Sequence, residues 1–368
     1  MNEQATSVPT APTAISRLIQ ASLHKQGGWM PFDRFMALAL YAPGLGYYSA
    51  GQQQIGRMPH GGSDFVTAPE ISPYFGQALA NSMREALKHS HTNTVYEFGA
   101  GNGSLALQLL NALGDAVQHY TIIDVSGSLR ERQAQTLQPH AHKVTWLDAL
   151  PDQLQGVVVG NEVLDAMPVR LLHRVNKVWQ ERGVVWREDT QAFDWQDQAT
   201  TDTPPFEVEG TQDYLCEVHA QAEAFVRSLA ERLTQGAMFF IDYGFPAHEY
   251  YHPQRHMGTL MCHQGHLSDT DPLSQVGFKD ITTHVNFTGV ALAAQEMGMQ
   301  VLGYTSQAHF LLNSGLLPLL ENASVSERSM AQKLIQDHEM GELFKVIAVG
   351  PDEWTPMGFV QADRTHRL

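Results

Sequence analysis

A glycine-rich stretch between a predicted strand and a predicted helix constrains the fold of this chain more than any other feature. It spans residues 94–104, TVYEFGAGNGS, where the acid Glu97 is followed by glycines at every second position, Gly99, Gly101 and Gly103. Because glycine lacks a Cβ, the chain can turn sharply there and let a ligand lie against main-chain atoms. The helix expected next offers free N–H groups and the positive end of its dipole. This order of strand, turn and helix predicts a nucleotide-like ligand at the strand end.

The glycine spacing indicates which nucleotide-like ligand to expect. Dinucleotide sites of the dehydrogenase kind read G-x-G-x-x-G, whereas the third glycine here comes one residue earlier. A carboxylate at Glu97 would repel a pyrophosphate but attract the ammonium group of S-adenosylmethionine. The pattern E-x-G-x-G-x-G resembles motif I of the class I methyltransferases. The alternative is a glycine turn that serves only tight packing between strand and helix.

The composition predicts a large folded protein with an acidic surface. At 368 residues the chain is long enough for two domains or for one large α/β domain with insertions. Apolar residues make up 43% and charged residues 17%, so we expect a sizeable core. The net charge of −16 argues against a nucleic-acid or anionic-membrane surface and suits a basic substrate.

The sequence favours a reducing compartment. Its two cysteines, Cys216 and Cys262, provide no disulfide framework. The N-terminal residues lack the basic and apolar regions of a secretory signal and the Arg-rich pattern of a mitochondrial transit peptide. The sequence contains no run of about 18 apolar residues, so we expect no membrane span. We therefore expect a soluble cytoplasmic protein without membrane insertion.

The chain divides into an N-terminal part and a long alternating part. Residues 1–88 are expected to form a helical and lid segment. Over residues 89–368 strands alternate with helices, which favours an α/β fold with a mostly parallel, doubly wound sheet. Two late strands are expected to form an antiparallel edge. Less regular segments at about 169–214 and 244–285 are interpreted as insertions, the first as a β-hairpin.

Acidic residues follow four of the predicted parallel strands: Glu97, Asp124, Asp148 and Glu162. Ligands of open α/β sheets bind beyond the carboxyl ends of the strands. Asp124 comes 21 residues after the last glycine of the turn, where an acid can accept both hydroxyls of a ribose. Asp148 is expected to meet the exocyclic amine of an adenine. The alternative for Asp148 is a turn cap before Pro151.

The loop after the fourth strand, residues 161–168, reads NEVLDAMP. It lacks the Asn-Pro-Pro-aromatic sequence of many amine methylases. Glu162 and Asp165 are three residues apart, and we expect both to point into one pocket. Two carboxylates can grip a guanidinium, orient a nitrogen lone pair and favour loss of its proton. The alternative is a capped turn or helix start with acids in its first turn.

The segment at 244–285 is rich in histidine, a residue that often binds metal ions. The pairs His252 with His256 and His263 with His266 have spacings that suit zinc. Cys262 stands alone, however, and no HExxH pattern accompanies these residues. We therefore predict no metal.

Seven segments together make the chain similar to the MidA-like methyltransferases, whose mitochondrial members are complex I assembly factors that methylate arginine. The resemblance implies a Rossmann-like class I methyltransferase domain, S-adenosyl-L-methionine as donor and a protein arginine as acceptor. A respiratory-complex subunit is the partner that this resemblance implies. The matching segments are YAPGLGYYSAG (41–51), GSDFVTAPEISPYFG (62–76), YEFGAGNGSLA (96–106), NEVLDAMPV (161–169), IDYG (241–244), GTLMCH (258–263) and DITTHVNF (280–287).

The resemblance also implies roles for individual residues. Segment 62–76 would form a lid that brings Asp64 beside the donor, and the last two segments would bring His263 near the acceptor. Asn286 departs from the family, where Asp is more common. The expected catalytic residues are Glu162, Asp165 and His284. The expected donor-binding residues are Thr67, Glu70, Glu97, Gly99, Gly101, Gly103, Asp124, Asp148 and Asn161.

Two alternatives to protein methylation remain open from the sequence. The insertions could shape a pocket for a small molecule, which would make the chain a small-molecule methyltransferase. The chain could also bind the cofactor and act chiefly as an assembly or scaffolding protein for a respiratory complex. Fold analogy alone does not separate these functions.

Overall fold

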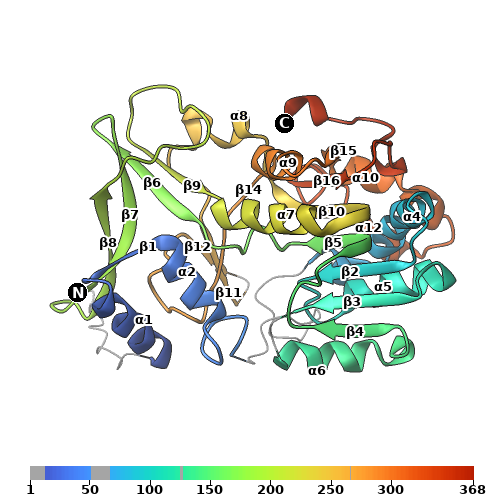
Figure 1. Cartoon of the computed structure of the whole chain (residues 1–368), viewed down its shortest axis with the longest axis horizontal. Helices are drawn as coiled ribbons and strands as arrows, with labels where there is room; N and C mark the ends of the chain where they lie inside the picture. The colour runs from blue at the N-terminus through green and yellow to red at the C-terminus, as the bar shows by residue number, and fades with distance from the viewer. Residues whose placement is uncertain (1–12, 51–66, 125–126, 266) are drawn as a thin grey trace.

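The computed structural model describes residues 13–50, 67–124, 127–265 and 267–368. Asp64, expected in the lid, and His266 lie outside these ranges. Figure 1 shows two lobes, one around a large sheet and one around a smaller sheet that carries the N-terminal helices. Within the described ranges, no helix combines the length and the apolar character needed to cross a membrane.

The large sheet is mostly parallel. Its strand order is β15-β16-β10-β5-β2-β3-β4, with β14 paired to the end of β10. Neighbours from β4 to β10 run parallel, whereas β16 pairs antiparallel with both β10 and β15. The predicted α/β sheet with an antiparallel edge is therefore confirmed. The strands are β2 (Thr94–Phe98), β3 (His119–Ile123), β4 (Val144–Leu147), β5 (Leu154–Asn161), β10 (Leu233–Phe245), β14 (Val285–Asn286), β15 (Gln300–Ser306) and β16 (Phe344–Gly350).

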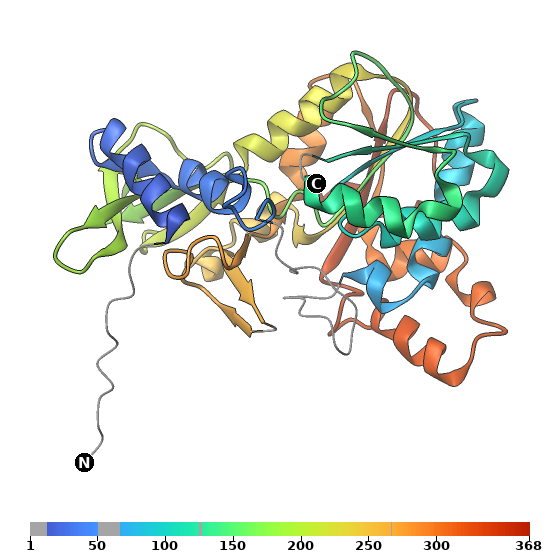
Figure 2. The ribbon, with the colours of Figure 1, turned by 90° about the horizontal axis from the view of Figure 1, so that it is seen from below.

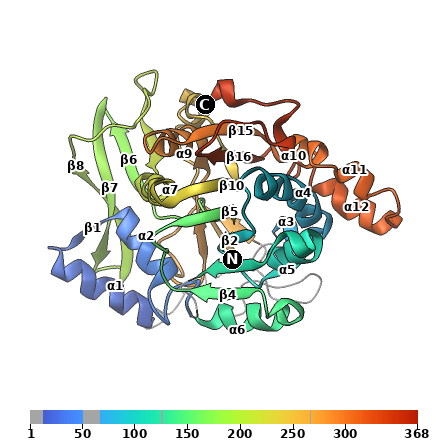
Figure 3. The same ribbon diagram turned by 45° about the vertical axis from the view of Figure 1, so that its right-hand side comes forward.

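Helices cover both faces of this sheet, as Figure 3 shows. Val157 and Val159 of β5 face a core shared with α4, α5 and α10, whereas Val158 faces a core shared with α7 and α9. Burial on both faces explains why β5 reads as a continuous apolar run. The helices are α3 (Ala68–Ile71), α4 (Tyr74–His89), α5 (Ser104–Leu113), α6 (Gly127–Thr136), α7 (Ala220–Arg232), α9 (Phe287–Gln295), α10 (Gln307–Asn313), α11 (Leu316–Leu319) and α12 (Val325–Lys333).

The smaller sheet and the N-terminal helices form the second lobe, here called the N-terminal lobe (Figure 2). Its strands are antiparallel, and β7 pairs with β1, β6 and β8. Phe35 and Met36 of α2 pack against Leu171, Val184 and Phe193 of the sheet. The elements are α1 (Ala14–Lys25), β1 (Trp29–Pro31), α2 (Phe32–Tyr41), β6 (Arg170–Val175), β7 (Val178–Arg187), β8 (Ala192–Ala199) and β9 (Tyr214–Val218).

This lobe differs from the β-hairpin predicted for residues 169–214. The segment forms three complete strands and leads into a fourth, and it recruits β1 from the N-terminal part of the chain. A three-residue strand such as β1 has no periodicity of its own, because it is defined by its pairing with β7.

The segment predicted as a second insertion, 244–285, contains a short helix and a three-stranded sheet of order β12-β11-β13. Its elements are α8 (Ala247–Tyr250), β11 (Met261–Gln264), β12 (Leu267–Asp269) and β13 (Asp280–Thr282).

Candidate active site

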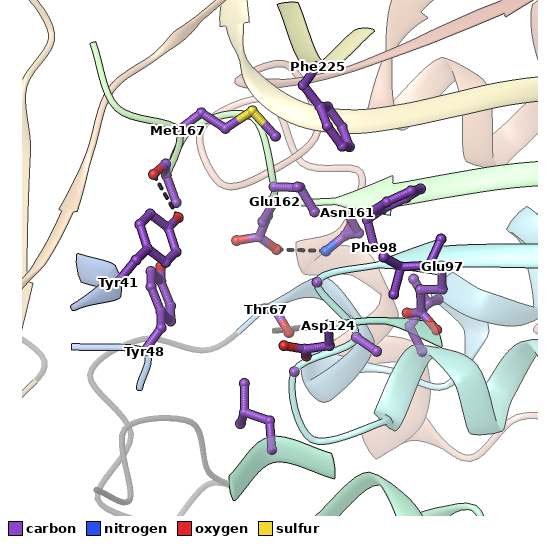
Figure 4. Close-up of a pocket in the computed structure, with 18 of the residues that line it drawn as sticks. Tyr41, Tyr48, Thr67, Glu97, Phe98, Asp124, Asn161, Glu162, Met167 and Phe225 are labelled. Carbon is purple, nitrogen blue, oxygen red and sulfur yellow. Dashed lines mark hydrogen bonds between the residues drawn. The ribbon is translucent and has the colours of Figure 1, made fainter. Parts of the chain in front are cut away.

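A cavity of about 780 Å³ lies at the carboxyl ends of the parallel strands. One part is lined by the turn after β2 and is called the glycine end. The other part is lined by Tyr41 of α2, by Tyr48 just after it and by Met167, and is called the tyrosine end. Figure 4 shows Glu162 between the two ends. The cavity therefore joins the N-terminal lobe to the large sheet.

The three glycines of the turn all have left-handed backbone angles. Their φ values are 63° at Gly99, 54° at Gly101 and 87° at Gly103. A Cβ at Gly99 would lie 2.8 Å from Cγ2 of Val163, so that position also lacks room for a side chain. Gly99 and Gly101 line the cavity, whereas Gly103 starts α5 behind it. The turn thus depends on glycine for its backbone shape.

Glu97 lies in β2 with only 1% of its surface exposed, yet it contributes to the cavity wall. Its Oε2 accepts a hydrogen bond of 2.6 Å from the hydroxyl of Tyr120. Burial raises the pKa of Glu97 to about 7, against the opposing effect of that hydrogen bond. A cation in the cavity would keep this carboxyl ionised.

Asp124 lines the cavity and is held by Gln133, a residue that the sequence interpretation missed. The Gln133 side chain donates 2.9 Å to Oδ2 of Asp124 and 3.0 Å to the carbonyl of Gly101. Its own carbonyl accepts from the indole of Trp146 at 2.9 Å. Gln133 is fully buried on the otherwise polar helix α6, and no local pattern marked it. It joins the glycine turn to the acid after β3.

Asp148 lies at the rim of the cavity. Its side chain is 85% exposed and pairs with Arg130, which also donates to the carbonyl of Asp124. An exposed ion pair of this kind contributes little to stability.

The short helix α3 forms the side of the cavity that was predicted as a lid. Thr67 and Glu70 both line the cavity. Glu70 accepts 2.6 Å from the amide of Asn102 in the glycine turn. Gln108 of α5 donates to the carbonyl of Pro69 at 2.7 Å. These two bonds attach the described part of the lid to the glycine turn and to α5.

Glu162 has an unusual backbone and an unusual environment. Its φ of 53° is left-handed, which costs a non-glycine residue about 1–3 kcal/mol. Its carboxyl accepts from the amide of Asn161 at 3.1 Å and from the backbone N–H of Ala68. Burial, and then the charge of Asp165, raise the pKa of Glu162 to about 8. The carboxyl lines the cavity and is therefore available to a ligand.

Asn161 also lines the cavity. Its Oδ1 is buried and has no hydrogen-bond partner among the described residues. A buried oxygen of this kind is stabilised when a ligand donates to it.

Asp165 does not line the cavity, so the expectation that it points into the same pocket as Glu162 is corrected. It is 4% exposed, and its Oδ2 accepts 2.6 Å from the hydroxyl of Tyr243. The left-handed turn at Glu162 explains the difference, because a three-residue spacing puts two side chains on one side only in a regular helix.

Asp242 of β10, which the sequence interpretation did not single out, holds the loop in place. Its Oδ2 accepts from the backbone N–H groups of Leu164 at 3.0 Å and Asp165 at 3.2 Å. Burial raises the pKa of both Asp165 and Asp242. The carboxyls of Asp165 and Asp242 therefore hold residues 161–168 in place from the side away from the cavity.

His284, expected as a catalytic residue, also lies away from the cavity lining. Its ring stacks on Phe245 with a centroid distance of 5.2 Å and meets Tyr243 edge-on. Burial, and then the charge of Arg255, lower the pKa of His284 to about 4. This places a neutral imidazole in an aromatic packing position.

Two other expectations concern this region. Asn286 caps α9, where its side chain accepts from the N–H of Gly289 at 3.3 Å, so its place here is structural. In the part of the chain that the structure describes, no group of three or more His, Cys, Asp or Glu could hold a metal ion.

The chain is similar to known methyltransferases in both sequence and structure. Residues 75–305 match a family described as "Putative S-adenosyl-L-methionine-dependent methyltransferase". A crystal structure from Burkholderia thailandensis, bound to S-adenosyl-homocysteine, has a TM-score of 0.93 and 46% identity. The match covers 98% of this chain and 100% of that chain.

Curated relatives are more distant. The mitochondrial protein arginine methyltransferase NDUFAF7 of Danio rerio is 27% identical over 86% of this chain and 82% of its own length. The human NDUFAF7 is also 27% identical, over 89% of this chain and 82% of its own length.

Proposed function

The chain belongs to the S-adenosyl-L-methionine-dependent methyltransferase family that matches residues 75–305, and we propose that its acceptor is an arginine side chain of another protein. S-adenosyl-L-methionine is the methyl donor of this family. Two observations support arginine as the acceptor. Relatives at about 27% identity are named protein arginine methyltransferases, and the cavity of this chain presents carboxyl groups to a cation.

The residues at the glycine end fit the donor. We assign Glu97 to the ammonium group, and the unpartnered Oδ1 of Asn161 gives that group a second acceptor. Asp124, held by Gln133, is assigned to the ribose hydroxyls, and Asp148 at the rim to the adenine amine. The left-handed glycines let the main chain approach the ligand closely. Thr67 and Glu70 close the same end from α3.

Glu162 carries the proposal for the acceptor. It is a carboxyl in the cavity with a pKa near 8, so an empty site holds it mostly protonated at neutral pH. A guanidinium beside it would lower that pKa and form charge-assisted hydrogen bonds. Bound donor supplies an electrophilic methyl group. Transfer forms a nitrogen–carbon bond, breaks a carbon–sulfur bond and releases one guanidinium proton, which the Glu162 carboxylate is placed to accept.

Asp165 takes a supporting role in this proposal. It contacts Tyr243 rather than the cavity, and its charge contributes to the raised pKa of Glu162. We therefore assign it to positioning residues 161–168 and not to direct contact with the acceptor.

Location and partner are part of the same proposal. Cys216 and Cys262 are buried free thiols in the structure, which supports a reducing environment such as the cytoplasm. The acceptor protein is proposed to present arginine in a flexible segment that can enter the cavity.

A labelling experiment tests the proposed function. Purified protein is incubated with labelled S-adenosyl-L-methionine and lysate of cells that lack it, and labelled proteins are hydrolysed to identify methylarginines. We expect labelled protein bands with wild type and about a hundredfold less label with Glu162→Gln. Label confined to small molecules would support metabolite methylation instead. Donor binding without any transfer would support a scaffolding role.

A further inference from the structure

Two stacked tyrosines form the wall of the tyrosine end. The rings of Tyr41 and Tyr48 have a centroid distance of 5.5 Å and an interplanar angle of 20°. Both side chains are partly buried and both line the cavity. Figure 4 shows them on one side of the cavity, with Glu162 on the other and Met167 above.

The hydroxyls of this pair are already used by the protein. Tyr41 donates 2.8 Å to the carbonyl of Ala166, and Tyr48 donates 2.7 Å to Oδ1 of Asp280. The fully buried Tyr47 packs edge-on against Tyr48 with a centroid distance of 5.0 Å. What the pair offers a ligand is therefore its aromatic surface in a fixed orientation, and not a free hydroxyl.

The electrostatic surroundings favour a positive charge in front of these rings. Asp280 is fully buried and Asp165 is 4% exposed. Burial first, and then the charges of these two acids, raise the pKa of Tyr41, so its phenol stays neutral. Among the described residues that line the cavity there is no Lys, Arg or His, whereas five carboxyl side chains do line it: Glu70, Glu97, Asp124, Asp148 and Glu162.

We propose that Tyr41, Tyr48 and Glu162 form the acceptor site, which selects a flat, positively charged side chain. A guanidinium would lie against the tyrosine rings while its N–H groups donate to Glu162. This inference rests on the proposed function, because it explains how an arginine acceptor is recognised.

The chemistry distinguishes arginine from its competitors. A guanidinium is planar and weakly hydrated, so it stacks on an aromatic ring more readily than the compact ammonium of lysine. A neutral side chain of the same shape, such as citrulline, lacks the attraction to the rings and to the carboxyl. The wall comes from the N-terminal lobe and the carboxyl from the large sheet, so both lobes contribute to selection.

A binding experiment on the wild-type protein tests the charge requirement. Protein saturated with S-adenosyl-homocysteine is titrated with three peptides, Gly-Gly-Xaa-Gly-Gly, in which the central residue is arginine, citrulline or lysine. We expect arginine to bind at least about tenfold more tightly than citrulline, with lysine in between. Equal dissociation constants for arginine and citrulline, or no binding of the arginine peptide at millimolar concentration, would overturn the proposal.

Substitutions test the aromatic wall. The double variant Tyr41→Leu and Tyr48→Leu keeps apolar volume but removes both rings, and Tyr41→Phe keeps the ring. We expect the double variant to weaken arginine-peptide binding about three- to thirtyfold, with S-adenosyl-homocysteine affinity unchanged. Tyr41→Phe should change arginine binding by less than about threefold. Tyr74→Leu, which removes a ring that packs outside the cavity, is the matched control.

The outcomes separate this inference from the proposed function. Equal weakening of arginine and citrulline by the double variant would mean that the wall supplies only shape, which overturns the inference. If the double variant does not fold, the peptide comparison on wild type still decides. If the folded double variant still methylates arginine in lysate and its KM for the arginine acceptor is unchanged, the proposed acceptor site is wrong but protein arginine methylation stands. Selective arginine binding together with label only in small molecules would defeat protein methylation alone.

Discussion

The glycine end and the tyrosine end of the cavity differ in how far apart their residues lie in the chain. The glycine end draws on residues 97–105, on the ends of adjacent parallel strands, and on Thr67 and Glu70 shortly before them in the chain. The tyrosine end joins residues 41–48 to residues 161–168, where the N-terminal lobe meets the large sheet. Donor binding should therefore depend on local backbone shape, whereas acceptor selection should depend on how two distant segments are held together.

The largest expected effect is on donor binding and comes from changing the backbone of the glycine turn. Gly101→Val places a β-branched residue at a φ of 54° against the cavity. Strain and lost space should weaken donor binding by about a hundredfold or more while the fold persists. Isothermal titration calorimetry with S-adenosyl-homocysteine measures this.

A matched glycine serves as the control for strain. Gly114 has a φ of 55°, and nothing lies within 4 Å of a Cβ built there. Gly114→Val should lower the melting temperature by an amount similar to Gly101→Val but leave donor affinity intact. Donor binding retained in Gly101→Val would contradict the assignment of the glycine end.

Glu162→Gln tests whether catalysis belongs to the region between the ends. The amide keeps the shape of the side chain but cannot accept a proton as a carboxylate does. Transfer should fall by about a hundredfold, with donor affinity changed by less than about twofold. The kcat/KM of wild type for the arginine acceptor should rise with pH through about 8, as Glu162 of the free enzyme ionises, and the variant should lose that rise.

Steady-state rates over pH 6–9 measure this effect, and the exposed Glu209→Gln is the control. A variant that keeps full activity and the same pH profile would remove Glu162 from the mechanism.

Gln133→Leu tests a residue that we expect to affect binding of the methyl donor indirectly, through Asp124 and Gly101. Leucine removes the two hydrogen bonds that the Gln133 side chain donates to Asp124 and to the carbonyl of Gly101. Donor affinity should fall at least about tenfold, since buried hydrogen bonds to charged groups contribute about 1.5–3 kcal/mol and about 1.4 kcal/mol is a factor of ten. Calorimetric titration gives the affinity.

Trp146→Phe is the comparison for Gln133. It removes the bond from the indole to Gln133 but keeps both contacts toward the cavity. Its donor affinity should stay close to wild type, and an equal loss in both variants would indicate general destabilisation.

The smallest expected effect is a pH dependence at the glycine end. The pKa of Glu97 is raised to about 7 in the empty cavity, and the ammonium of the donor favours the ionised form. Below pH 7 binding must therefore release a proton, so affinity should weaken about fivefold between pH 7 and 6 and level off above 7. Titrations in buffers of different ionisation enthalpy count that proton. Glu97→Gln should bind weakly without this slope, and an unchanged slope would point to another group.

The same contrast between the two ends explains what the sequence could predict. The turn after β2 and the acids at the strand ends belong to short segments whose spacing carries their chemistry, and the structure places Gly99, Gly101, Glu97, Asp124 and Asp148 around one cavity. The alternating strands and helices likewise predict the large sheet.

Features that depend on distant contacts were less predictable. Asp165 was expected beside Glu162, but the left-handed backbone at Glu162 turns it toward Tyr243. His284 was placed near the pocket by resemblance, whereas packing stacks it on Phe245. Gln133 is one buried amide within a polar helix, and burial cannot be read from such a pattern.

The tyrosine wall had one signal in the sequence. Tyr41 and Tyr48 belong to the segment YAPGLGYYSAG, which resembled the family but suggested no role by its spacing. Their orientation depends on acceptors at Ala166 and Asp280, more than a hundred residues away.

The pairing of β1 with β7 also orders events during synthesis. Met30 pairs with Val184, so about 150 residues must be translated after β1 before its partner strand exists. At about 5–20 residues per second, that interval is about 8–30 seconds. Throughout it, the apolar faces of α1 and α2 lack the sheet that later covers Phe35 and Met36. On a ribosome, the first strands and helices of the large sheet are thus made before the N-terminal lobe can close. During that time, α1 and α2 of the nascent chain are exposed to chaperones and proteases.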